Sequence, residues 1–318
     1  MGDTQEQTIP VVDLDHYRNG DATTRQAFIE AFGSGIREFG FVAVEGHGVD
    51  TALVKRNYAL YQRFFALDDT LKARYEDPAT GRQRGYTSFG VEHAKDHDRP
   101  DLKEFWHLGR DLPLEHPLKG RLPDNVWPEE IPELKGASLD LFRAMERCAM
   151  DLLGALSVYL NEPEARLPDL ALEGNSIIRV IHYPACEGFT DDGAVRAAQH
   201  EDINLITLLP EATQGGLEIL TRGGDWMPIH AIPGQLVVDS GDMLKRLTND
   251  TIPATTHRVV NPADQTTSRY SMPFFVHPHP DAMLKVLDSC LEEGAEPRYA
   301  PITADDYLKQ RLKAIGVA

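Results

Sequence analysis

Apolar residues in the first half of the chain recur at helical spacing. Between Thr24 and Phe39 they return every three or four positions, and the same spacing runs from Leu53 to Leu67. A longer stripe from Glu133 to Leu160 predicts one long amphipathic helix. Short strands are expected at Ile9 to Leu14 and at Gly40 to Val44. The pattern therefore predicts a mainly helical N-terminal part whose apolar stripes belong to a core.

After Asn175 the period changes to that of strands. Short apolar runs separated by turn residues read SIIRVIHYP, INLITLLP, GGLEIL, WMPIHAI, GQLVVDSGD, ATTHRVVNP and RYSMPFFVHP. Gly223 and Gly224 between two of these runs indicate a hairpin. A double-sheet jelly roll closes such strands. We therefore expect an α+β, mainly β fold, with a jelly-roll core braced by N-terminal helices and by the long central helix.

Composition and charge narrow the classes of protein. Hydrophobic residues make up 42% of the chain and charged residues 26%, as is ordinary for a globular protein, and no apolar tract is long enough to span a membrane. Acidic residues outnumber basic ones by 50 to 32, and the formal net charge of −18 opposes attraction to nucleic acid or anionic membranes. No signal peptide is recognisable, and the three cysteines form no metal or disulfide motif. We expect a cytoplasmic protein with neither nucleic acid nor membrane as partner.

Metal-binding residues are the first candidates for chemistry. In His200-Glu201-Asp202 the first and third side chains point to one face at the entry to a predicted strand. A second triplet, His279-Pro280-Asp281, contains the last histidine of the chain and cannot recruit a later one. His257 lies in the strand-like run ATTHRVV, and 54 residues separate it from Asp202. Two imidazoles and one carboxylate leave open positions on an octahedral Fe(II), as in the facial triad of oxygen-activating iron enzymes.

A candidate carboxylate clamp follows the second histidine. Eleven residues separate His257 from Arg269-Tyr270-Ser271, and a strand would place Arg269 and Ser271 on one face. The guanidinium presents a planar fork of donors that matches two carboxylate oxygens. The apolar run MPFFV directly after it indicates that this strand is buried.

These motifs, in this order, resemble the isopenicillin N synthase-like family of iron and 2-oxoglutarate-dependent dioxygenases. The resemblance covers nearly the whole chain and includes IPVVDL, FGFVAVEGHGV, FFALDDTLKARY, DLKEFWHLG, the Tyr183-Pro184 pair, the triad, GDMLKRLTND and Arg269-x-Ser271. It implies that His200, Asp202 and His257 bind Fe(II). It also implies that Arg269 and Ser271 hold the distal carboxylate of 2-oxoglutarate, with a hydroxyl from Tyr183, while O2 takes the last position on the metal.

The resemblance also implies a reaction. Oxidative decarboxylation of 2-oxoglutarate to succinate and CO2 would be coupled to oxidation, by default hydroxylation, of a C–H bond of a small molecule. An amino-acid-like compound or a secondary-metabolite intermediate is the expected substrate. The expected substrate residues are Arg84, Thr87, Phe89, Glu104 and Phe275. Asp242 and Asn249 are candidates for orienting His257.

The sequence leaves three alternatives open. Plant members of the family commonly carry Asn two residues before the Tyr-Pro tyrosine, where this chain has Ile181. Isopenicillin N synthase keeps an Arg-x-Ser but uses it on its peptide substrate, so an oxidase or cyclase that needs Fe(II) and O2 without 2-oxoglutarate is one alternative. A zinc hydrolase or isomerase on a cupin-like barrel is the second. A barrel that binds metal without turnover is the third.

The expected organisation is a single catalytic unit over residues 1–318. Within it, residues 1–130 form a helical part with loops, 131–170 a supporting long helix, 175–280 the jelly-roll core with the iron site, and 281–318 a C-terminal extension ending in a helix. Residues 80–130 are rich in charge, Gly and Pro, which is typical of surface or active-site loops, and little secondary structure is predicted there.

Overall fold

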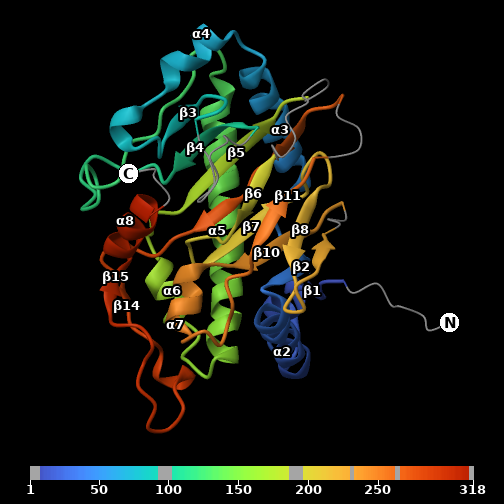
Figure 1. Ribbon diagram of the computed structural model, residues 1–318, viewed down its shortest axis with the longest axis vertical. Helices are drawn as coiled ribbons and strands as arrows, with labels where there is room; N and C mark the ends of the chain where they lie inside the picture. Colours follow the sequence, from blue (N-terminus) through green and yellow to red (C-terminus); the bar gives the residue numbers. More distant parts are fainter. Residues whose placement is uncertain (1–7, 92–101, 186–195, 230–232, 262–265, 315–318) are drawn as a thin grey trace, which may run out of the picture.

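The N-terminal helices follow the apolar stripes of the sequence. The computed structural model describes residues 8–91, 102–185, 196–229, 233–261 and 266–314 (Figure 1). Its first elements are β1 (Val11–Asp13), α1 (Leu14–Asn19), α2 (Ala22–Phe39), β2 (Phe41–Glu45), α3 (Thr51–Phe65) and α4 (Asp69–Lys72), then 3-10 turns at Ala73–Tyr75 and Pro78–Thr80. Helix α2 begins where Asp21 accepts a hydrogen bond from the N–H of Thr24 at 2.8 Å. It ends at Gly40, whose φ of 69° suits a residue without a Cβ. The two predicted helices of this part are confirmed.

Helix α5 (Glu133–Tyr159) is the long central helix that the sequence predicts. Its buried face includes Leu141, Met145 and Leu152. It packs against α2 and α3, and Phe142 meets Phe274 of the main sheet with ring centroids 5.1 Å apart. Figure 1 shows α5 running along the back of the strands, with the short helix α6 (Arg166–Ala171) after it. The helix therefore braces the sheet, as predicted.

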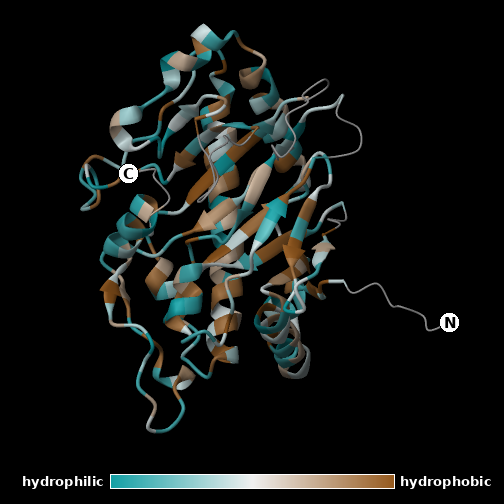
Figure 2. Ribbon diagram, in the orientation of Figure 1, coloured by the Kyte–Doolittle hydropathy of each residue, from teal (hydrophilic) through white to brown (hydrophobic). Residues whose placement is uncertain are grey.

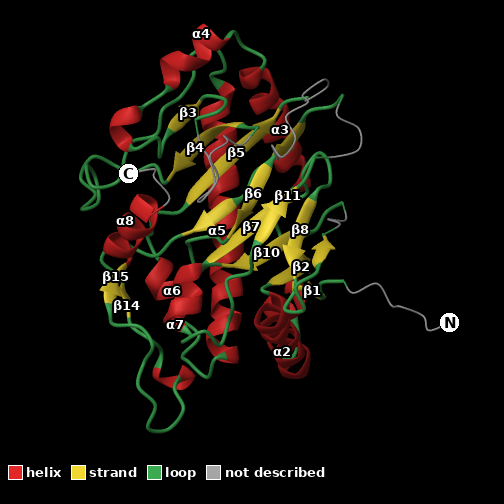
Figure 3. Cartoon of the chain, viewed as in Figure 1, coloured by secondary structure: helices red, strands yellow, loops and turns green. Residues whose placement is uncertain are grey.

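Two sheets form the β part of the molecule (Figure 3). The large sheet has the order β1-β2-β10-β7-β13-β5-β4-β3, with β12 paired to β5 beside β13. Its further strands are β3 (Gly85–Thr87), β4 (Glu104–Gly109), β5 (Ile177–Tyr183), β7 (Ile206–Pro210), β10 (Leu236–Ser240), β12 (Arg269–Ser271) and β13 (Phe274–Val276). The small sheet has the order β6-β11-β8-β9, made by β6 (Ala197–His200), β8 (Leu217–Leu220), β9 (Trp226–Pro228) and β11 (His257–Val259). Apart from the parallel β1–β2 pair, the described pairings in both sheets are antiparallel, as a jelly roll requires.

The large sheet buries both of its faces. On one face Trp106 and Val180 join the main apolar core, which also contains the buried side chains of α2, α3 and α5. On the other face Phe105, Ile181 and Tyr183 pack against Ala197 and Val259 of the small sheet. Figure 2 shows the hydrophobic residues concentrated on these strands. The space between the two sheets is therefore the interior of the barrel.

The predicted hairpin at Gly223 and Gly224 is confirmed. It joins β8 to β9, and the N–H of Gly224, whose φ is 90°, donates to the carbonyl of Thr221 at 3.0 Å.

The C-terminal part of the chain returns to helices and short strands. Helix α7 (Asp242–Leu247) follows β10. The C-terminal extension then contains β14 (Met283–Leu284), a 3-10 turn at Asp288–Cys290, β15 (Ile302–Thr303) and α8 (Ala304–Ala314). Helix α8 is the predicted C-terminal helix.

Residues 80–130 hold more structure than the sequence predicts. They contain β3 and the six-residue strand β4, in which every residue is buried. A strand buried on both faces shows no alternation of apolar and polar residues. The polar residues Glu104 and His107 also interrupt the apolar run by which such a strand is recognised in a sequence. Part of the expected substrate loop, residues 92–101, lies outside the described residues. Across the described part of the chain, no helix combines the length and apolar character needed to cross a membrane.

Candidate metal centre

Three side chains inside the barrel bring their ligand atoms together. His200 ends β6 and His257 begins β11, and these two residues face each other across the antiparallel pair. Asp202 follows two residues after His200, and its Oδ1 lies 3.8 Å from Nε2 of His200 and 3.9 Å from Nε2 of His257. One ligand atom from each residue falls within 4.8 Å of the others. The three residues can therefore share one metal ion.

Backbone carbonyls set the orientation of both imidazoles. Nδ1 of His200 lies 2.8 Å from the carbonyl oxygen of Ala198, and Nδ1 of His257 lies 3.1 Å from that of Thr255. Because a carbonyl only accepts, each Nδ1 carries the proton and each Nε2 keeps its lone pair for a metal. The residues present thus fit a metal ion with two nitrogen ligands and one oxygen ligand.

Electrostatics also favour the metal-binding form of these side chains. Desolvation first, and the charge of His257 second, lower the pKa of His200 to about 4. The side chain of His200 is 43% exposed, which weakens the effect of desolvation. The ring centroids of His200 and His257 are only 4.4 Å apart, however, so two protonated rings would repel each other even at an exposed site. Neutral imidazole is the form that binds metal ions.

Asp202 is held from several directions. Its Oδ2 accepts a hydrogen bond from the hydroxyl of Thr207 on β7, and its backbone carbonyl accepts from the N–H of Asp242 at 2.7 Å. The amide of Asn204 donates to the same Thr207 hydroxyl at 2.9 Å. Burial first, and the charge of Asp202 second, raise the pKa of the neighbouring Asp239 well above its ordinary value. The carboxylate therefore has a fixed direction before any metal binds.

A second polar site lies on strand β12, along the same barrel interior. Arg269 pairs with Tyr183 across β12 and β5, and its guanidinium carbon lies 5.0 Å from the centre of the tyrosine ring. Its Nη1 donates to the hydroxyl of Ser271 at 3.2 Å, and its Nε donates to the carbonyls of Gln214 and Gly215, each at 3.1 Å. Arg269 is 2% exposed. Among the residues that the structure describes, none offers it a carboxylate within salt-bridge distance.

A buried guanidinium without a carboxylate is costly unless a ligand supplies one. The predicted clamp residues Arg269, Ser271 and Tyr183 are thus brought together in an arrangement that suits the distal carboxylate of a dicarboxylic acid.

Comparisons with known proteins decide the family. Residues 9–130 match the model of the non-haem dioxygenase in morphine synthesis N-terminal domain, and residues 174–278 match that of the 2OG-Fe(II) oxygenase superfamily. A 2OG-Fe(II) oxygenase family protein from Caulobacter crescentus is 39% identical, with a TM-score of 0.87 over 98% of this chain and 99% of that one. The chain belongs to the 2OG-Fe(II) oxygenase superfamily.

Further relatives agree with this placement of the oxygenase. The 2-oxoglutarate-Fe(II) type oxidoreductase hxnY of Emericella nidulans is 29% identical, and the match covers 96% of this chain and 89% of that protein. A full-length Neurospora crassa protein, solved in complex with alpha-KG and thymine, is 26% identical with a TM-score of 0.87 over 98% of each chain. The oxygenase is accordingly a 2-oxoglutarate- and Fe(II)-dependent oxidoreductase that uses O2, and its family acts on small-molecule substrates.

On the barrel face of β5 the oxygenase carries a cation close to two aromatic rings. Arg179 lies two residues before Ile181 on β5, with its guanidinium carbon 4.5 Å from the ring centre of Phe105 and 5.7 Å from that of Phe275. Its Nε donates to Nε2 of His107 at 2.5 Å. This arrangement suits recognition of a planar group with acceptor oxygens.

The structure places the expected substrate residues in different surroundings. Thr87 is 1% exposed on the same face of the sheet as Phe105, opposite which it pairs, and its hydroxyl has no hydrogen-bond partner among the described residues. Phe275 pairs with Thr207, the residue that donates to Asp202. Both positions are therefore compatible with a substrate pocket.

Glu104 lies on the opposite face of β4 from Phe105. Its carboxylate accepts hydrogen bonds from Nζ of Lys72 at 2.7 Å and from the hydroxyl of Tyr86, and it lies 2.7 Å from Nδ1 of His182. Tyr86 and His182 lie on the face of the sheet that Trp106 shares with the helical core, and Lys72 comes from α4. We therefore leave Glu104 out of the substrate pocket.

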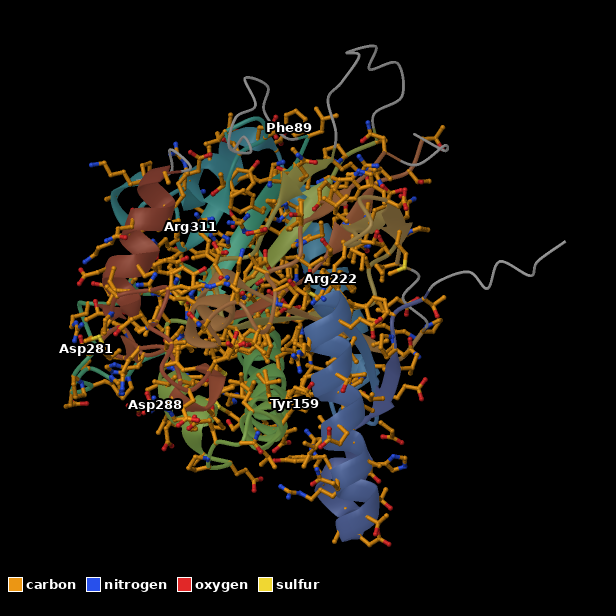
Figure 4. All side chains as sticks on the ribbon, turned by 60° about the horizontal axis from the view of Figure 1, so that its bottom comes forward. Phe89, Tyr159, Arg222, Asp281, Asp288 and Arg311 are labelled. Atoms are coloured by element: carbon orange, nitrogen blue, oxygen red, sulfur yellow. The ribbon has the colours of Figure 1, made fainter. Side chains whose placement is uncertain are left out.

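Arg84 and Phe89 are also separate from the triad in their contacts. Arg84 is fully buried and donates to the carbonyl of Gln83 at 2.7 Å and to the side-chain oxygen of Asn175 at 3.3 Å. Desolvation lowers the pKa of Arg84 to about 10. Phe89 is 45% exposed and lies at the rim of the molecule in Figure 4. These contacts tie neither residue to the iron ligands.

The proposed helpers of His257 act elsewhere. The side chain of Asp242 pairs with Arg311 of α8 at 2.8 Å, and Asn249 accepts from the N–H of Arg298 at 3.0 Å. The carbonyl of Thr255 orients His257 instead, and sequence gives no signal for a backbone group. Sequence reasoning also missed Thr207, whose approach to Asp202 could be seen only once β7 was placed.

Proposed function

We propose that the oxygenase hydroxylates an unactivated C–H bond of a small molecule and releases succinate and CO2. The observation that carries the proposal is a metal triad next to an arginine clamp inside one barrel. A 2-oxo acid that chelates a metal at one end and carries a carboxylate at the other satisfies both sites. 2-Oxoglutarate has this structure.

His200 and His257 would each give Nε2 to Fe(II), and Asp202 would give a carboxylate oxygen. When bound, the iron, 2-oxoglutarate and O2 supply the oxidising chemistry. The chain's own residues fix geometry: backbone carbonyls hold the imidazoles, and Thr207 holds the carboxylate. Phe41, whose ring contacts that of His257 at 5.6 Å between centroids, helps to exclude water from the site.

Arg269 would bind the distal carboxylate of 2-oxoglutarate with its Nη edge, since its Nε edge already donates to backbone carbonyls. Ser271 and Tyr183 would add hydroxyl groups. Ile181, where plant members carry Asn, offers an apolar wall that needs no polar partner.

At the substrate end, Arg179 between Phe105 and Phe275 favours a compound with a planar carboxylate or carbonyl group and an apolar body. Thymine, present in the Neurospora crassa structure, has carbonyl oxygens on a flat ring. Amino-acid-like compounds and secondary-metabolite intermediates that carry a carboxylate meet the same requirement. Thr87 would donate one further hydrogen bond.

The test of the reaction is product analysis. Purified protein with Fe(II), 2-oxoglutarate and air is offered amino acids, aromatic and heterocyclic acids, and pyrimidines. The proposal expects a product that has gained one oxygen atom, with one succinate formed per product. Oxidised product without succinate would establish instead an oxidase that draws its electrons from the substrate.

The test of the substrate end is Arg179→Met. Loss of a charged hydrogen-bond donor is expected to raise the substrate KM about tenfold or more, while the KM for 2-oxoglutarate stays unchanged. Arg143→Met is the matched control, because Arg143 lies on the exposed side of α5 with its side chain 58% exposed. Equal effects of the two substitutions would exclude Arg179 from substrate binding.

We further propose that residues 1–318 act as one catalytic unit, because the main apolar core joins side chains from Val12 to Ala304. Residence in the cytoplasm, without nucleic acid or membrane as partner, stays a prediction. Fractionation of cells that express the protein tests it.

A further inference from the structure

A second buried arginine lies behind the clamp. Arg196, directly before β6, is 1% exposed. Its Nη1 donates to the side-chain oxygen of Gln214 at 3.1 Å, and its Nη2 donates to the carbonyl of Thr267 at 3.0 Å. Its backbone N–H donates to the side-chain oxygen of Asn261 at 3.1 Å. One guanidinium therefore joins segments that are far apart in the sequence.

The Arg196 guanidinium holds Gln214 and Thr267, and the chain segments around both residues bear directly on Arg269. Gln214 and Gly215 present the two carbonyls that accept from Nε of Arg269, each at 3.1 Å. Thr267 lies two residues before Arg269 on the same chain segment, and its hydroxyl accepts from the side-chain amide of Gln214. Arg196 thus links Gln214, whose carbonyl accepts from Arg269, to the segment that leads into β12, the strand that carries Arg269.

The segment around Gln214 is also paired with β12. The N–H of Thr213 donates to the carbonyl of Tyr270 at 3.0 Å, and the N–H of Tyr270 donates to the hydroxyl of Thr213 at 2.8 Å. These bonds fix the segment along the strand. The side chain of Gln214, by contrast, contacts Arg196 and Thr267.

We propose that Arg196 is a positioning residue for co-substrate binding, acting through Gln214 and Thr267 to aim the Arg269 guanidinium at the distal carboxylate of 2-oxoglutarate. The proposal rests on the clamp role given to Arg269 under the proposed function. Lysine cannot replace Arg196 fully, because the two acceptors lie in the directions of a planar fork.

The experiment compares two 2-oxo acids that share the metal-chelating end. 2-Oxoglutarate and 2-oxobutyrate are titrated separately into the anaerobic Fe(II) protein, and the visible metal-to-ligand charge-transfer band gives each Kd. 2-Oxobutyrate has no distal carboxylate. Arg196→Met is expected to weaken 2-oxoglutarate about tenfold, because a misaligned Arg269 loses about one charge-assisted contact with the distal carboxylate, and to change the Kd of 2-oxobutyrate less than about twofold. Arg196→Lys is expected to recover part of the loss.

Equal weakening of the two acids by Arg196→Met would overturn the proposal, because a merely structural defect does not distinguish them. No change in either Kd would overturn it too. Gln214→Ala provides a second variant in case Arg196→Met does not fold. It keeps the backbone carbonyl, and it is expected to weaken 2-oxoglutarate selectively but less. Arg222→Met is the control, since Arg222, labelled in Figure 4, donates to the carbonyl of Arg37 on the exposed surface.

Arg269→Met distinguishes a failure of the Arg196 proposal from a failure of the clamp role assigned to Arg269. If Arg269→Met also fails to distinguish the two acids, the clamp assignment itself is wrong. If Arg269→Met distinguishes them and Arg196→Met does not, only the role of Arg196 is wrong. In the Arg269→Met background, a further Arg196→Met is expected to add less than about twofold, because the group that it positions is gone.

Discussion

Glu104→Gln tests the placement of this carboxylate in the core. Glu104 and Lys72 have side chains only 5% and 6% exposed, and their charged atoms lie 2.7 Å apart. The substitution leaves the Lys72 ammonium buried beside Asp69 at 3.0 Å, whose side chain is 95% exposed and therefore compensates poorly. Removing one partner of a buried ion pair costs about 3–5 kcal/mol. For a chain of this size, that loss lowers Tm by about 4–8 °C.

The assay is equilibrium unfolding by urea together with steady-state kinetics. Asp140→Asn is the control, because Asp140 pairs with Arg143 where the side chains are 57% and 58% exposed, and a loss of about 1 kcal/mol or less is expected there. A variant of Glu104 that keeps wild-type stability but has a raised substrate KM would refute the placement and return Glu104 to the pocket.

The pH dependence of the same variant gives a second readout. Burial alone would raise the pKa of Glu104, but hydrogen bonds from His182, Lys72 and Tyr86 together lower it below the ordinary 4.5. A carboxyl group with a lowered pKa stabilises the fold above its unfolded pKa and loses that contribution as the pH falls through the folded value. The difference in unfolding free energy between wild type and Glu104→Gln is therefore constant above roughly pH 5 and shrinks below 4.5.

Three further substitutions test the supports of the site and the fold. Thr207→Val removes the hydroxyl donor to Asp202 and is expected to weaken Fe(II) binding about tenfold, measured by anaerobic titration; unchanged affinity would contradict the supporting role. In Gly241→Ala the new Cβ would lie 2.4 Å from the backbone and side-chain oxygens of Asn204, so we expect weaker iron binding and a loss of about 1–3 kcal/mol in urea unfolding. Leu153→Ala, in the fully buried face of α5, is expected to cost about 2–5 kcal/mol and to leave the Kd of 2-oxoglutarate unchanged, whereas a changed Kd would mean that α5 does more than brace the sheet.

Much of the metal centre could be predicted because it depends on local spacing. Residues two apart in an extended segment share a face, and His200 and Asp202 do point together, although Asp202 lies just after the end of β6 and not within the strand that the sequence predicts there. The change of period after Asn175 predicted the barrel that brings His257 to them. The same rule predicted that Arg269 and Ser271 would act as a pair.

The substrate side could not be predicted in the same way. Alternation shows that Glu104 and Phe105 face opposite sides of a strand, but it does not say which side is the barrel interior. That choice follows from the pairing of Phe105 with Ile181, a contact between strands that are far apart in the sequence. Arg196 was missed for a similar reason, because its partners come from three separate segments.

The most direct test of the account is an anomalous-scattering map at the iron edge, from crystals loaded without oxygen with Fe(II) and 2-oxoglutarate. The account predicts one strong peak within coordination distance of His200 Nε2, His257 Nε2 and a carboxylate oxygen of Asp202. It also predicts 2-oxoglutarate chelating that iron with its distal carboxylate on Arg269. Iron at another place, or a distal carboxylate that does not reach Arg269, would contradict it.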